Sequence, residues 1–205
     1  MQQFVDFFVA PALNQPAEIL VDIRSFPYLA DHGFLDMLVL PGSFYIDMAI
    51  NLDRQLSNRI PSVVRNVVFQ HPVIISEEGS VIKVEVIDHG KNRIEYKFYE
   101  AYAENEGAFS VGSRYAAKLE VDRNVLQLSK GKKAFPPPPA LQSETQAQLD
   151  QENFYGRLHQ NGNNYGRSFQ NISSIWRIGS EAFGKLNFCG KDQLSEPHVT
   201  LSSKT

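Results

Sequence analysis

The sequence predicts an α+β fold in which an antiparallel sheet wraps around one long helix, followed by the beginning of a second unit of the same kind. The helix is indicated by apolar residues that recur at every fourth position between Phe44 and Leu56, directly after a Pro-Gly turn. The sheet is indicated by two runs of apolar alternation, at 82–86 and 94–98, which a glycine-containing turn separates. One helix cannot bury its apolar stripe alone, so the neighbouring strands are expected to cover it.

The predicted helix begins near Gly42, and both Gly42 and Ser43 are residue types that suit its cap. Asp47 lies in the early turns, where a negative charge interacts favourably with the helix dipole. The apolar stripe comprises Phe44, Met48, Leu52 and Leu56.

Strands are expected on both sides of the Asp88–Asn92 turn and before and after this pair. They are the segments 63–68, 82–86, 94–98 and 110–121. Val73–Ile75 is expected to continue the first of them past Pro72. Because short connections join these strands, they are expected to pair as antiparallel neighbours.

Composition divides the chain into three parts. Residues 1–128 read as the complete unit, and residues 129–150 as a linker that contains the proline run Phe135–Pro139. The proline run also fits a ligand for a proline-recognising module, although a semi-rigid linker is the simpler interpretation. Residues 151–205 read as the incomplete second unit, with a helix that ends at Gly162 and strands at 169–178 and 182–188.

His32 is the main candidate for chemistry. It lies nine residues before Pro41, at the end of a short approach segment that leads into the predicted helix. Burial and the positive end of a helix both favour neutral imidazole, the form that takes a proton from carbon. A hydrogen-bonded structural histidine is the alternative interpretation.

Two separated motifs resemble those of the dehydratase domains of polyketide synthases and fatty acid synthases. The first, HxxxGxxxxP, is matched by His32 and Pro41, with Asp36 at the glycine position. The second, GxxYGPxFQ, is matched by Gly162–Gln170, with Arg167 in place of the proline. The resemblance spans nearly the whole chain. It implies the hotdog fold, a sheet around a central helix, with one complete hotdog followed by part of a second.

The resemblance also implies a reaction. Such a domain eliminates water from a β-hydroxyacyl group carried on the phosphopantetheine of an acyl carrier protein and gives an enoyl thioester. It makes His32 the base, Pro41 and Gly42 the residues that shape the thioester end of the site, and Tyr165, Gly166 and Phe169 the pocket lining.

Two of these positions keep two interpretations. Asp36 either narrows the pocket and brings charge near the thioester, because glycine there allows close approach, or it points into solvent. Tyr165 either lies beside the substrate or is simply a packed ring in a turn.

The resemblance implies no cofactor bound to the domain itself. The implied partners are an acyl carrier protein and neighbouring synthase domains, and a homodimer is compatible with it.

The family's second catalytic group, an aspartate within a motif resembling HPxLLD, has no counterpart in this sequence. Pro197–Ser202 is a poor approximation to that motif, and Glu181, Asp192 and Glu196 are expected to be surface charges. A truncated domain, a degenerate domain and an acid supplied by a partner chain are the three explanations. Loss of one acid–base group costs about 10²–10⁴-fold in rate, so the chain alone is expected to be severely impaired.

Two other functions remain open. A non-catalytic, dehydratase-like module that organises a multienzyme would need no acid. A hotdog thioesterase would need a carboxylate that activates water, and Asp47 is the candidate. Within the first class, double-bond shift or cyclisation would use the same base.

Composition excludes several classes. The 205 residues carry a net charge of −3, which gives no basic footprint for nucleic acid or anionic membrane. Cys189 is the only cysteine, so no intrachain disulfide forms, and His71, His89 and His159 show no metal-ligand spacing. There is no signal-peptide pattern and no apolar run long enough to span a membrane, so a cytoplasmic location is expected.

Overall fold

The computed structural model describes residues 17–58, 61, 63–103, 111–124, 148–187 and 198–201. The chain divides into two compact units. The first is formed from residues within Met1–Leu29 and Met37–Leu128, and the second from residues within Ala30–Asp36 and Ser129–Thr205. The division differs from the predicted one in the segment Ala30–Asp36, which the sequence places with the first part.

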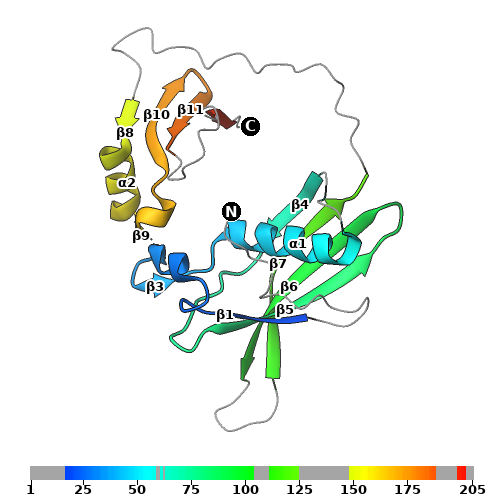
Figure 1. Ribbon diagram of the computed structural model, residues 1–205. Coiled ribbons are helices and arrows are strands. Elements are labelled where there is room, and N and C mark those ends of the chain that lie inside the picture. Colours follow the sequence, from blue (N-terminus) through cyan, green and yellow to red (C-terminus); the bar gives the residue numbers. More distant parts are fainter. Residues whose placement is uncertain are drawn as a thin grey trace. The chain divides into compact units, whose positions relative to one another are not determined.

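The first unit is built on a five-stranded antiparallel sheet with the strand order β1-β5-β6-β7-β4 (Figure 1). The strands are β1 (Ala17–Val21), β4 (Val63–Phe69), β5 (Ser80–Asp88), β6 (Arg93–Ala103) and β7 (Val111–Asp122). The expected hairpin joins β5 to β6, and Gly90 has a φ of +73° in its turn. The predicted alternation is confirmed in 82–86, since Ile82, Val84 and Val86 are buried while Glu85 is exposed. In 94–98 it holds only in part, because Glu95 on the expected outer face is also buried, at 8% exposed.

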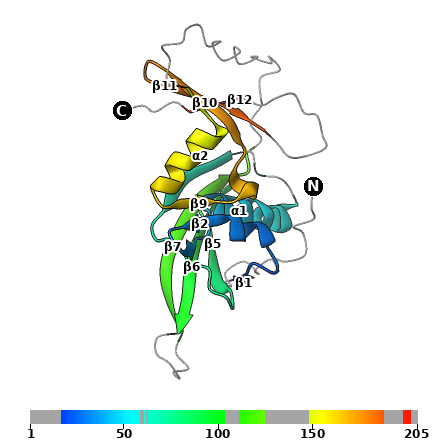
Figure 2. The same ribbon diagram turned by 90° about the vertical axis from the view of Figure 1, so that its left-hand side faces the viewer.

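Helix α1 (Gly42–Ser57) lies across one face of this sheet in both views (Figures 1 and 2). Phe44, Met48 and Leu52 are at most 3% exposed, and Leu56 packs against the edge of the same core. A sheet packed around one central helix is the hotdog arrangement, so the predicted fold of the first unit is confirmed.

The cap of α1 corrects a prediction. The cap residue is Pro41, in extended backbone with φ −65° and ψ 143°, and no side chain forms a cap hydrogen bond. Gly42 and Ser43 are therefore wrong as caps and form the first turn instead. Proline suits this position because its ring fixes φ, and its carbonyl accepts a 2.9 Å hydrogen bond from the Phe44 amide.

A second buried row runs along α1 beside the predicted stripe, at Tyr45, Ala49 and Asp53. Asp53 is fully buried, and its Oδ1 accepts hydrogen bonds from the Tyr96 hydroxyl and from Arg123 Nε, both at 2.9 Å. Arg123 Nη2 lies 2.7 Å from the same oxygen. The ion pair joins the C-terminal half of the helix to the residue after β7, and the Tyr96 hydrogen bond joins it to β6.

Two strand assignments in the first unit also differ from expectation. Val73–Ile75 does not continue β4; instead Leu40 N donates to Val73 O at 2.9 Å, and Ile75 N donates to Leu38 O at 2.8 Å. The pairing is with the segment before α1, because Pro72 cannot donate to the β4 ladder. Strand β1 was not predicted, although its buried Ala17, Ile19 and Val21 alternate with exposed residues.

The second unit has a four-stranded antiparallel sheet with the order β12-β11-β10-β8. Figure 1 labels β8, β10 and β11, and Figure 2 labels β12. The elements of this unit are β8 (Gln148–Asp150), α2 (Gln151–Gln160), β10 (Ile172–Ile178), β11 (Glu181–Leu186) and β12 (His198–Leu201). Among its described residues, Phe183 is the one apolar side chain that is buried, at 6% exposed. This sheet matches the expected start of a second hotdog.

The predicted C-terminal boundary of the linker, at residue 150, is wrong. Gln148–Asp150 forms β8, which pairs with β10, and Asp150 Oδ1 then caps α2 by accepting the Asn153 amide at 2.9 Å. The proline run Phe135–Pro139 lies outside the described residues, as does Cys189.

The segment compared with HPxLLD is partly described. His198–Leu201 forms strand β12 against β11 rather than a helix. After Gly166, the described residues contain one 3-10 helix, η3 (Arg167–Phe169), and no α-helix.

No helix of the described residues is both long and apolar enough to cross a membrane. In the same part of the chain, no three His, Cys, Asp or Glu side chains are grouped as metal ligands would be.

Candidate active site

The start of the first motif meets the second motif in the second unit, because strand β2 (His32–Phe34) pairs with strand β9 (Asn163–Tyr165). The antiparallel register places His32 directly opposite Tyr165. Directly opposite residues project their side chains from the same face of a strand pair. The two rings accordingly lie with their centroids 5.2 Å apart.

Phe169 is a second aromatic neighbour of the His32 ring. It lies on η3, directly after β9, and its ring centroid is 4.9 Å from that of His32, in edge-to-face geometry. The rings of Tyr165 and Phe169 are stacked 6.4 Å apart. All three side chains are half-buried, so the imidazole lies beside two apolar ring surfaces that limit the access of water. Histidine is the side chain that most often serves as a general base.

Asp31, the last residue of the 3-10 helix η2 (Pro27–Asp31), forms hydrogen bonds with the segment between Tyr165 and Phe169. Its carbonyl accepts the Gly166 amide at 2.7 Å, and its Oδ2 accepts the Ser168 amide at 2.8 Å. Hydrogen bonds from the side chain and backbone of Ser168 hold the pKa of the Asp31 carboxyl below its usual value. Asp31 therefore carries its charge at neutral pH.

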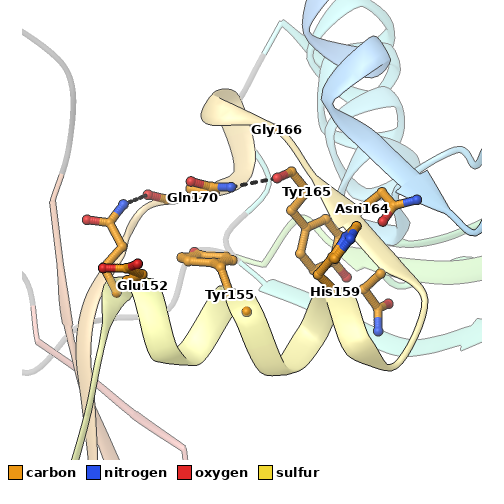
Figure 3. A pocket seen from close by; sticks show the side chains of 10 residues that line it. Glu152, Tyr155, His159, Asn164, Tyr165, Gly166 and Gln170 are labelled. Atoms are coloured by element: carbon orange, nitrogen blue, oxygen red, sulfur yellow. Dashed lines mark hydrogen bonds between the residues drawn. The ribbon is translucent and has the colours of Figure 1, made fainter.

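A cavity of about 680 Å³ opens between α2 and the segment 163–170. From α2 it is lined by Glu152, Tyr155 and His159, and from β9 by Asn164 and Tyr165 (Figure 3). Gly166 also lines it, whereas His32 and Phe169 do not. Tyr165 therefore belongs to both groups, since it contacts the His32 ring and borders the cavity.

Glutamine side chains fix the backbone around this cavity. Gln170 Nε2 donates to the Tyr165 carbonyl at 2.7 Å, and Gln151 Nε2 donates to the Gln170 carbonyl at 3.0 Å (Figure 3). The Tyr155 hydroxyl donates to the Phe169 carbonyl at 3.0 Å. These bonds hold α2, β9 and η3 in one arrangement.

The other predicted site residues lie elsewhere. Pro41 and Gly42 belong to the first unit, where a Cβ on Gly42 would lie 2.8 Å from Phe69 Cζ. Asp36 is exposed, in the turn that follows β2. Exposure is what the solvent-facing interpretation of Asp36 expects, and its role at the substrate remains a prediction.

Sequence reasoning missed Asp31 and Tyr155 as parts of this site. Both bind backbone groups of the segment 166–169. This segment is far from Asp31 in the sequence, and a turn separates it from Tyr155. The one available signal was that Asp31 directly precedes the candidate base.

Gly166→Ala should destabilise the second unit by about 1–3 kcal/mol. A Cβ at this position would overlap the Asp31 carboxylate and lie 2.8 Å from Asp31 Cβ, so the carboxylate must leave Ser168. Urea unfolding followed through Trp176, the only tryptophan, measures this unit. The control is Gly156→Ala on α2, where a Cβ meets nothing within 4 Å and about 0.5–1 kcal/mol of stabilisation is expected. Equal midpoints for the two variants would contradict the proposed close approach.

Two family models match the chain. One, described as polyketide synthase dehydratase domain, covers residues 16–101, and the other, described as polyketide synthase dehydratase N-terminal domain, covers residues 133–198. Together they include both motifs.

Curated relatives are multienzymes of which this chain matches a small part. It is 26% identical over 171 residues to pikromycin polyketide synthase component PikAII of Streptomyces venezuelae, covering 81% of this chain and 4% of that protein. It is 24% identical over 165 residues to mycoketide-CoA synthase of Mycobacterium tuberculosis, covering 78% of this chain and 4% of that protein.

Solved structures show the same fold. The dehydratase domain from the CurF module of curacin polyketide synthase superposes with a TM-score of 0.68 and 18% identity, over 90% of this chain and 64% of that one. The erythromycin dehydratase gives a TM-score of 0.63 and 18% identity, over 86% of this chain and 62% of that one. With both motifs on adjacent strands and both family models matched, the chain belongs to the polyketide synthase dehydratase family.

Proposed function

We propose that the chain is part of a dehydratase domain of a modular polyketide synthase and that it provides the base for eliminating water from a β-hydroxyacyl thioester. The observation that carries this proposal is the β2–β9 pairing, which sets His32 beside Tyr165 and Phe169. Membership of the dehydratase family supports the choice of reaction.

In the proposed reaction, a ring nitrogen of His32 takes the α-proton of the acyl group. The electron pair of that C–H bond forms the new double bond, and the β-hydroxyl leaves as water after receiving a proton from an acid. Three carboxylates that follow the second motif are the candidates for this acid. Glu181 is exposed at the start of β11, and Asp192 and Glu196 lie outside the described residues. The proposal therefore assigns to the described residues the proton-abstraction half of the reaction.

The proposal includes the partners that such a substrate needs. The acyl group would be carried on the phosphopantetheine of an acyl carrier protein, and the domain itself would hold no cofactor. Neighbouring synthase domains in the cytoplasm, and a homodimer, belong to the same proposal. The relatives support the proposal of neighbouring synthase domains, because the chain matches only a small share of each of these multienzymes.

A thioesterase is the second candidate because of Asp47. This carboxylate lies on α1, and burial raises its pKa. Burial and the charge of Asp47 together raise the pKa of Tyr28 to about 12. A half-buried carboxylate on the central helix is the group that water activation would require.

Product analysis separates these functions. The chain is incubated with a β-hydroxyacyl pantetheine thioester, and the products are resolved by mass spectrometry. We expect slow formation of the enoyl thioester, which decreases strongly in His32→Ala. Release of free thiol that depends on Asp47 would establish the thioesterase instead. An unchanged substrate, together with binding of the acyl carrier protein, would identify the non-catalytic module.

A further inference from the structure

We propose that Asp31 is a positioning residue for His32: by binding the backbone on both sides of Arg167, it holds Tyr165 and Phe169 against the imidazole. This inference rests on the proposed role of His32 as the base. Asp31 touches neither substrate nor reacting atoms in this proposal and acts through its neighbour.

Asp31 forms two hydrogen bonds across the strand pair. Its backbone carbonyl extends the β2–β9 ladder by accepting the Gly166 amide at 2.7 Å. Its carboxylate reaches two residues further and accepts the Ser168 amide at 2.8 Å. At the other end of β2, the Leu35 amide donates to the Gly162 carbonyl at 2.6 Å. The short strand that carries His32 is therefore tied down on both sides.

Asp31 and Gly166 match each other sterically. A Cβ on residue 166 would occupy the space of the Asp31 carboxylate, so this carboxylate can reach Ser168 only over a glycine. The φ of Gly166 is −81°, an angle that any residue adopts. The glycine is therefore required for space and not for backbone conformation, which links its presence in the motif to Asp31.

The hydrogen bonds of Asp31 also affect the two rings beside His32. Tyr165 and Phe169 lie on either side of the 166–168 segment that Asp31 binds, and both ring centroids are within 5.2 Å of the His32 centroid. The lowered pKa of Asp31 means that its acceptor is charged, and hydrogen bonds to charged acceptors are stronger than neutral ones. Loss of the carboxylate would free η3, and with it Phe169, from the strand that carries the base.

The test compares Asp31→Ala and Asp31→Asn with the wild-type chain by NMR. In Asp31→Ala, amide exchange of Ser168 should accelerate about tenfold or more. The His32 ring resonances should move towards those of an unfolded peptide, because they lose the ring currents of Tyr165 and Phe169. Asn keeps an oxygen that accepts the Ser168 amide, so Asp31→Asn should retain most of the wild-type pattern. In an active preparation, kcat should decrease about tenfold in Asp31→Ala with KM unchanged.

The matched control is Asp150→Ala, which removes another carboxylate that accepts one backbone amide at a helix start of the same unit. It should accelerate exchange of Asn153 and leave the His32 resonances unchanged. Unchanged His32 resonances in Asp31→Ala, or equal shifts in Asp150→Ala, would overturn the positioning role. The resonances do not depend on turnover. If His32→Ala kept full elimination activity, the proposed function would fail while this measurement still decided whether Asp31 positions the ring.

Discussion

Replacing His32 with alanine should lower proton abstraction from the substrate by about 10²–10⁴-fold, the usual contribution of a general base. Because no acid is identified among the described residues, the sharpest readout is exchange of the α-proton, which needs the base alone. In heavy water the imidazole takes the α-proton, exchanges it with solvent and returns a deuteron to the same carbon. Deuterium incorporation into the thioester, measured by mass spectrometry, reports this step without loss of water.

Control variants separate chemistry from folding in this experiment. His89→Ala removes another histidine, one whose Nε2 lies 2.9 Å from Glu95 Oε2 in the first unit, and should leave exchange unchanged. Circular dichroism should show that both variants are folded. Exchange in His32→Ala within twofold of the wild-type rate would reject His32 as the base.

The largest effect on stability is expected for Asp53→Ala, at about 3 kcal/mol, because breaking a buried ion pair leaves the partner charge uncompensated. The Tyr96 hydroxyl would lose its acceptor in the same variant. The expected value is at the lower end for buried pairs, since the Arg123 side chain is 22% exposed and keeps some contact with water. Urea unfolding followed by far-ultraviolet circular dichroism measures the change.

A matched surface pair provides the control. Glu18 lies 3.4 Å from Lys83 but is 60% exposed, so Glu18→Ala should change the free energy of unfolding by about 0.5 kcal/mol or less. Asp53→Asn keeps the shape and one acceptor and should fall between the two variants. If Asp53→Ala were no more destabilising than Glu18→Ala, the ion pair would not be a support of the first unit.

The first unit could be predicted from the sequence because its signals are local. The stripe at Phe44, Met48 and Leu52 has the helical period, and β5 and β6 alternate around an evident turn. The Asp53 ion pair could not be predicted in this way. Tyr96 and Arg123 are 43 and 70 residues away in the chain, and no pattern around Asp53 marks it as buried.

The candidate site was predictable only in part, for a similar reason. The two motifs identify His32, Tyr165 and Phe169, and the structure brings these three together. Neither motif shows that the Ala30–Asp36 segment belongs with the second unit, or that Asp31 binds Ser168. Both features depend on pairing between segments that are distant in the sequence. The periodicity of apolar residues carries no information about such pairing. The roles of Pro41, Gly42 and Asp36 at the substrate remain predictions.

The pairing of His32 with Tyr165 closes a loop of about 130 residues, and loops of this length carry a large entropy of closure. The hairpin of β5 and β6 requires a far shorter loop and can form early. The short strand pair at the histidine should therefore be among the last contacts to assemble during folding. It should also be among the first contacts to open during native fluctuations, so the arrangement of the candidate site is expected to be lost before the rest of its unit unfolds.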